Sequence, residues 1–306
     1  MIRYFLHRFL LTLPALWLVL TLVFLLIHIV PGDPVEQMLG ESAAPGQITE
    51  VRHSLGLDQP ILVQYGRYLG GIFRGDFGQS IRFQAPVRHV IFERYPATLQ
   101  LAFLALLVSA GIAIPAGVIA AHRRGSATDR AIGVFTLFGL AIPNFALGPL
   151  LIAFFSIYLG WLPVSGRGSA LNYILPAATL GAALAAILTR MVRGAMLEEL
   201  SSDYVRTARA KGLSEYAVLV RHALRNALIP IITILGLQFG TLLAGTIVTE
   251  TIFSWPGLGR LTVQAISSRD YPLLQGCILV IALSYVLVNL LTDLLYAFID
   301  PRVRLS

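Results

Sequence analysis

Phe9–Val30 reads FLLTLPALWLVLTLVFLLIHIV, a run of 22 residues without aspartate, glutamate, lysine or arginine. As a helix it would rise about 33 Å, enough to cross the roughly 30 Å hydrocarbon core of a bilayer. The run is longer than the apolar part of a cleaved signal peptide, which has about 7–15 residues. We therefore expect it to stay in the protein as its first membrane span.

Five further apolar segments are long enough to cross a bilayer. The chain is 56% hydrophobic and 13% charged, whereas soluble domains carry about 25% charged residues. Because backbone groups in lipid must be hydrogen-bonded within the protein, helices are expected. The sequence predicts an all-α integral membrane protein with six transmembrane helices. The further spans are expected at Ala97–Ala121, Ala131–Leu159, Tyr173–Met191, Ala227–Thr249 and Leu273–Ile299.

Positive charge is distributed unevenly between the two sides of these spans. With the N-terminus inside, 14 of the 23 basic residues fall in short inner segments. Basic residues in short loops favour the cytoplasmic side, so both termini are predicted to be cytoplasmic. The same rule explains the net charge of +7, which in a soluble protein would suggest nucleic acid; no nucleic-acid partner is expected. The single cysteine, Cys277, excludes a disulfide within the chain.

An ordered segment is expected on the outer side, between the first two spans. Pro31–Pro96 contains turn signals and a helix start at Asp58-Gln59-Pro60, with apolar residues at helical spacing after it. We expect it to pack on the outer face of the helices. The chain is thus divided into an N-terminal span with this segment, residues 1–96, and a core of five helices, residues 97–306.

A polar loop, residues 193–225, is expected on the cytoplasmic side within that core. Asp203–Gly212, DYVRTARAKG, reads as a short helix. Ser202 or Asp203 can cap its start, and Gly212 suits a left-handed stop at its end. Lys211 lies near the C-terminal end, where the helix dipole favours a cation.

The motifs of catalysis are missing from the sequence. It contains no G-x-x-x-x-G-K-[ST], H-E-x-x-H, C-x-x-C or G-x-S-x-G pattern. No catalytic or metal-binding residue is therefore predicted, and the chain is not expected to hydrolyse ATP. Polar residues at the spans, Glu250, Asn289 and Asp293, are candidates for the pathway by default. Alternatively, they are structural, with Glu250 paired with an outer arginine and Asp293 with an inner-face arginine or a neighbouring helix.

Short motifs along nearly the whole chain resemble one family. The cytoplasmic loop, with Asp203–Gly212 followed by RHALRNALIP at residues 221–230, resembles the permease loop of bacterial ABC importers. Arg206-Thr207-Ala208 stands where the general family has E-A-A, a departure that resembles the peptide/nickel subfamily. The other matching motifs are PGDPV at 31–35, LGLDQP at 55–60, GDFG at 75–78, TETIFSWPGLGR at 249–260, RDYP at 269–272 and DPR at 300–302.

The resemblance implies the type I ABC importer permease fold and a subunit of a larger machine in the bacterial inner membrane. Its implied partners are a homologous second permease, two cytoplasmic ATPases, an extracytoplasmic substrate-binding protein and membrane lipid. ATP and Mg²⁺ would be bound by the ATPases, so no cofactor is expected in this chain. The short cytoplasmic helix would be the coupling helix, and small Ala208, Ala210 and Gly212 would permit close approach to an ATPase. The implied coupling residues are Asp203, Tyr204, Arg206, Thr207, Ala208, Lys211, Gly212 and Leu213.

Three functional hypotheses stay open on sequence grounds. The first is an ATP-driven import pathway for dipeptides or oligopeptides. The second keeps the same machine and changes the cargo to nickel, a nickel chelate or glutathione. The third is an ion-coupled secondary transporter, which would usually need a relay of intramembrane carboxylates or histidines and often has internal repeats. Neither feature is evident in the sequence.

Overall fold

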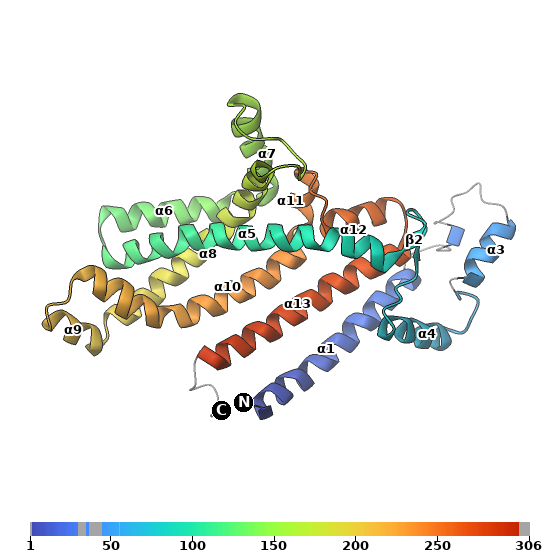
Figure 1. Ribbon diagram of the computed structural model, residues 1–306, viewed down its shortest axis with the longest axis horizontal. Helices are drawn as coiled ribbons and strands as arrows, with labels where there is room; N and C mark the ends of the chain where they lie inside the picture. The colour runs from blue at the N-terminus through green and yellow to red at the C-terminus, as the bar shows by residue number, and fades with distance from the viewer. Residues whose placement is uncertain (1, 30–34, 37–44, 55, 300–306) are drawn as a thin grey trace.

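Long helices lying side by side form the body of the molecule (Figure 1). The computed structural model describes residues 2–29, 35–36, 45–54 and 56–299. Among these residues, five helical segments are long and apolar enough to cross a membrane, and a bent pair supplies a sixth span if it is counted as one. The long helices are α1 (Ile2–Ile29), α5 (Val87–His122), α8 (Ile174–Leu200), α10 (Arg225–Gly245) and α13 (Tyr271–Ile299).

Shorter elements connect these helices. They are α3 (Pro45–Ser54), α4 (Ile61–Phe73), β1 (Gln79–Ser80), β2 (Ala85–Pro86), α6 (Ala127–Ala141), α7 (Asn144–Leu151), a π-helix η1 (Ile152–Tyr158), a 3₁₀ turn η2 (Ala170–Tyr173), α9 (Asp203–Ala210), a π-helix η3 (Ala217–Leu224), α11 (Ile247–Ile252) and α12 (Leu258–Ser267). The two strands pair antiparallel as a small hairpin.

The most extensive helix packing is between α5 and α8, where glycines allow close approach. A Cβ added at Gly117 would lie 2.6 Å from the side chain of Val192, and one at Gly181 would lie 2.9 Å from the carbonyl oxygen of Ala105. Small residues let helix backbones approach closely in a membrane, where dispersion contacts replace the hydrophobic effect as the main attraction. The two helices therefore form a rigid centre for the bundle.

The third expected span is not one continuous helix. Its segment forms α6 and then α7 with η1, and the two parts are bent by 101°. Ile142 at the break has extended backbone angles, φ −90° and ψ 113°, as expected for a residue before a proline. Pro143 also lacks an N–H to continue the helix. In Figure 1, α6 runs along α5 and α8, whereas α7 turns away from them.

Helix α4, from the segment between the first two spans, packs on the first span. Helix α4 begins directly after Pro60, and the rings of Tyr65 and Tyr68 lie 5.1 Å and 5.6 Å from the ring of Phe24 in α1. The hydroxyl groups of Thr21 and Tyr65 are 2.8 Å apart. Burial raises the pKa of Tyr68 to about 12, so this phenol stays neutral in the packed layer. The motif residues 31–34 and 300–302 lie outside the described residues.

Asp270 fastens the β1–β2 hairpin to the core. Its carboxylate accepts hydrogen bonds from the Ser80 hydroxyl at 2.5 Å and from the Arg82 backbone N–H at 3.1 Å. It also accepts one from the backbone N–H of Leu273, in the first turn of α13. Asp270 is buried, and its three donors satisfy it there. The RDYP motif thus acts as a structural link between the outer segment and the last helix.

Candidate functional site

Helix α9 projects from the end of the bundle between α8 and η3 (Figure 1). It is eight residues long, and Ser202 is its N-cap, although the serine side chain makes no capping hydrogen bond. Asp203 lies in the first turn, where the helix dipole favours a negative charge. At the other end Gly212 has a φ of +76°, and its N–H donates to the carbonyl of Arg209 at 2.9 Å. The predicted glycine stop is therefore confirmed.

The inner face of α9 packs on the permease itself. Val205 and Ala208 are buried and form a small core with Val218 of η3. The small side chain of Ala208 thus lets α9 pack closely on η3, and contact of Ala208 with an ATPase stays a prediction. Val205 and Ala208 are three residues apart in the sequence, a spacing that places both side chains on the same face of a helix.

Tyr204 anchors the start of α9 to the end of α8. It is partly buried against the same core, and its hydroxyl donates a hydrogen bond to the carboxylate of Glu199. Burial, followed by this hydrogen bond, raises the pKa of Tyr204. The phenol therefore remains a donor at neutral pH. Arg209 makes a second anchor through a 2.8 Å ion pair with Glu215.

The outer face of α9 is polar and cationic. The exposed residues among those predicted for coupling are Asp203, Arg206, Thr207, Lys211, Gly212 and Leu213. Leu213 offers an apolar side chain, 41% exposed, directly after the glycine stop. A short rigid helix with one packed face and one exposed face can transmit a displacement to the permease, because the packed face prevents the helix from rotating about its axis.

Glu250 belongs to α11, and its side chain lies at the N-terminus of α12. Its carboxylate is fully buried and accepts hydrogen bonds from Thr98 at 2.7 Å, Thr246 at 3.1 Å and the backbone N–H of Arg260 at 2.9 Å. Arg260 thus pairs with Glu250 through its backbone, while its guanidinium donates to the carbonyl of Ser254. The expected contact with an outer arginine is thus made to the backbone of Arg260 and not to its side chain, and the N-terminus of α12 supplies a positive dipole.

Two glycines of the TETIFSWPGLGR motif make room for this carboxylate. A Cβ at Gly257 would lie 2.3 Å from Glu250, and one at Gly259 would lie 3.0 Å from it. Thr98, which the sequence reading missed, joins the group: its hydroxyl accepts the N–H of Leu258 at 2.7 Å while donating to Glu250. The motif is therefore a folded corner that ties α5, α11 and α12 together.

Asn289 and Asp293 lie one turn apart on α13, and both are partly buried. The Oδ1 atom of Asn289 is buried without a hydrogen-bond partner within the described part of the chain. It faces α10, where a Cβ at Gly240 would lie 3.3 Å from it. The structure does not bring Asn289 or Asp293 to Glu250, and the described residues contain no group of three histidine, cysteine or acidic residues arranged to hold a metal ion.

Models of one transporter family match this chain along most of its length. The model described as "Binding-protein-dependent transport system inner membrane component" matches residues 113–305. This chain belongs to that family. The family's N-terminal model matches residues 1–102.

Curated family members are similar over the full chain. The glutathione transport system permease protein GsiC of Escherichia coli (strain K12) is 46% identical over 304 residues, which cover 99% of both chains. GsiC of Salmonella paratyphi A is 45% identical over the same share of both chains.

Solved structures show the same fold at lower identity. The inward-facing MetNI methionine ABC transporter matches with a TM-score of 0.59 at 19% identity, covering 69% of this chain and 96% of that chain. The chain is thus a permease subunit of an ABC importer and not an enzyme. It is a multi-pass inner-membrane protein that works with an ATPase and a substrate-binding protein.

Proposed function

We propose that this permease forms half of a pathway that imports glutathione. The observation that carries the proposal is the 46% identity to the glutathione permease GsiC over 99% of both chains. Glutathione is a tripeptide, so it also belongs to the short-peptide cargo class expected from the sequence. The other half of the pathway is supplied by a homologous permease, and two ATPase subunits bind ATP and Mg²⁺.

The exposed face of α9 is the surface that contacts an ATPase subunit in this proposal. Support comes from its position at the end of the bundle, its packed inner face and the cations on its free face. The concentration of basic residues at this end supports a cytoplasmic location for α9 and for both termini. This chain itself carries no cofactor in the mechanism; it supplies the helices that move.

Uptake by the purified importer tests the cargo. The permease is reconstituted in liposomes with the second permease, the two ATPases and the substrate-binding protein of the importer. We expect radiolabelled glutathione to enter with ATP present and to be outcompeted by unlabelled glutathione rather than by dialanine or nickel. ATP-dependent uptake of dialanine without uptake of glutathione contradicts the proposed cargo. Uptake driven by a proton gradient without ATPase subunits contradicts an ATP-driven importer.

A further inference from the structure

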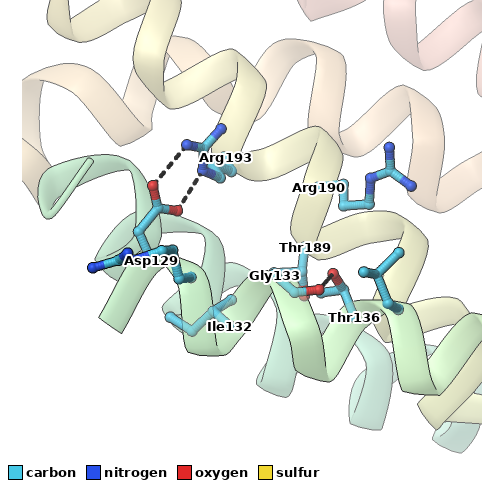
Figure 2. Close-up of a pocket in the computed structure, with 9 residues that line it drawn as sticks. Asp129, Ile132, Gly133, Thr136, Thr189, Arg190 and Arg193 are labelled. Carbon is cyan, nitrogen blue, oxygen red and sulfur yellow. Dashed lines mark hydrogen bonds and ion pairs between the residues drawn. The ribbon is translucent and has the colours of Figure 1, made fainter. Parts of the chain in front are cut away.

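A cavity of about 380 Å³ lies between α6 and α8, at the end of the bundle from which α9 projects (Figures 1 and 2). The two helices meet here side by side, and the cavity opens at their surface rather than inside the bundle core. It is lined by Asp129, Arg130, Ile132, Gly133, Thr136, Leu137, Thr189, Arg190 and Arg193.

The cavity carries an excess of positive charge. Asp129 and Arg193 neutralise each other through two hydrogen bonds of 2.7 Å and 2.8 Å, drawn as dashed lines in Figure 2. Asp129 is the only acidic residue in the lining. Arg130 and Arg190 are both exposed, and within the described chain neither guanidinium pairs with a carboxylate. Two cations in one cavity without counter-charges favour an anionic ligand.

The surroundings of the cavity are apolar. Ile132 and Leu137 line it, and Leu137 is 60% exposed. Next to them on α6, Phe135 and Phe138 are also exposed. In Figure 1 α6 lies at the border of the bundle, alongside α5 and α8. An exposed apolar helix face in a membrane protein suits acyl chains, whereas it gives no advantage to a small free anion.

We propose that this cavity binds the phosphate headgroup of an anionic phospholipid, with Arg130 and Arg190 as its cationic ligands and the acyl chains along α6. Basic pockets between transmembrane helices on the cytoplasmic side suit such headgroups. The placement in that leaflet rests on the orientation given under the proposed function. A lipid held here would bridge α6 and α8 close to the loop that carries α9.

Lipid retention by the purified importer complex tests the site. Native mass spectrometry follows phosphatidylglycerol and phosphatidylcholine on the wild-type complex and on an Arg130→Gln, Arg190→Gln double variant. An arginine near an anionic surface contributes about fivefold in affinity, so the double variant should bind phosphatidylglycerol roughly 25-fold more weakly. Binding of phosphatidylcholine should not change.

Two matched controls separate charge from fold and position. Arg190→Lys keeps the charge, so it should retain most of the phosphatidylglycerol. Arg88→Gln removes an exposed arginine from the opposite end of α5 and should have no effect. Equal phosphatidylglycerol binding by the wild type and the double variant overturns the site. If millimolar inorganic phosphate displaces phosphatidylglycerol and phosphatidylcholine to the same extent, the assignment to a phospholipid headgroup is overturned.

These outcomes are independent of the cargo. The lipid experiment measures binding to the assembled complex without transport. Its result can therefore be interpreted even if the importer does not take up glutathione. Conversely, a loss of lipid binding with normal glutathione uptake would leave the proposed function in place.

Discussion

At the scale of single residues, a buried carboxylate shows how this fold uses charge. Glu250 is fully buried, yet its oxygens accept from two threonine hydroxyls and from a backbone N–H in the first turn of α12. Hydrogen bonds to a charged acceptor are each worth about 1.5–3 kcal/mol, which offsets the cost of removing the carboxylate from water. The carboxylate therefore fixes a corner of the protein.

Gly212 gives the sharpest residue-scale prediction. An added Cβ would meet nothing within 4 Å, but the φ of +76° is unfavourable for other residues. The left-handed conformation costs an L-residue about 1–2 kcal/mol, and a β-branched residue suffers most. We expect Gly212→Val to displace the end of α9 and to lower ATP-driven uptake severalfold while the ATPases continue to hydrolyse ATP.

The control for this prediction is Gly212→Asn, because asparagine tolerates the left-handed conformation. It fills the same open space at the same position, so it separates backbone strain from the added side chain. Uptake and hydrolysis by Gly212→Asn should both stay near the wild-type values. If the assembled importer with Gly212→Val shows normal uptake, α9 is not the coupling element.

At the scale of elements, links between distant segments decide the architecture. The hairpin β1–β2 is only two residues per strand, and an isolated hairpin of this size is not stable in water. It is held because Asp270, which lies 190 residues after Ser80 in the sequence, bonds Ser80 and the backbone of Arg82. The β1–β2 part of this segment is thus tied to the core, which suits docking of the substrate-binding protein.

Asp270→Ala should release this hairpin. The loss of hydrogen bonds to a buried carboxylate is expected to destabilise the permease by at least about 2 kcal/mol and to weaken binding-protein affinity. Thermal unfolding of the complex and a binding titration with the substrate-binding protein measure the two effects.

The matched control is Asp76→Ala, because Asp76 is exposed and, within the described residues, its carboxylate accepts a hydrogen bond from the nearby N–H of Gly78. It should leave the melting temperature nearly unchanged. If Asp270→Ala binds the substrate-binding protein as tightly as the wild type does, the hairpin is not part of the docking surface.

At the scale of the whole molecule, the two ends of the bundle differ in chemistry. One end carries α9 with its cations, and the other carries α4 and the β1–β2 hairpin (Figure 1). The positive-inside rule assigns the first end to the cytoplasm. This orientation would put the proposed ATPase surface and the proposed binding-protein surface on opposite sides of the membrane, as an importer requires.

Thiol labelling tests the orientation. Cys277 is buried and can be replaced by alanine, so that Arg74→Cys at the end of α4 and Ala210→Cys in α9 each provide one exposed thiol. In intact spheroplasts a membrane-impermeant maleimide should label Arg74→Cys, and it should label Ala210→Cys only after permeabilisation. The reverse pattern contradicts cytoplasmic termini.

The sequence by itself determined the fold class, the approximate spans and the position of α9. These features depend on composition and local pattern: long apolar runs must be helical in lipid, and Gly212 stops a helix because of its own backbone freedom. The family resemblance then added the partners. The spacing of Val205 and Ala208 places them on one face of α9, but whether that face of an eight-residue helix packs inward depends on Val218 in the next element.

Only the tertiary structure decided the roles of the polar residues and the course of the third span. Glu250 meets Thr98 from a helix about 150 positions earlier, and Arg193 meets Asp129 across two helices. Such pairings depend on how elements dock, which local sequence does not encode. The 101° break after α6 has a local cause in Pro143, but its direction is set by the packing of α6 and α7 on α8. Hydropathy sums over a window, so it detects an apolar run without detecting a bend inside it.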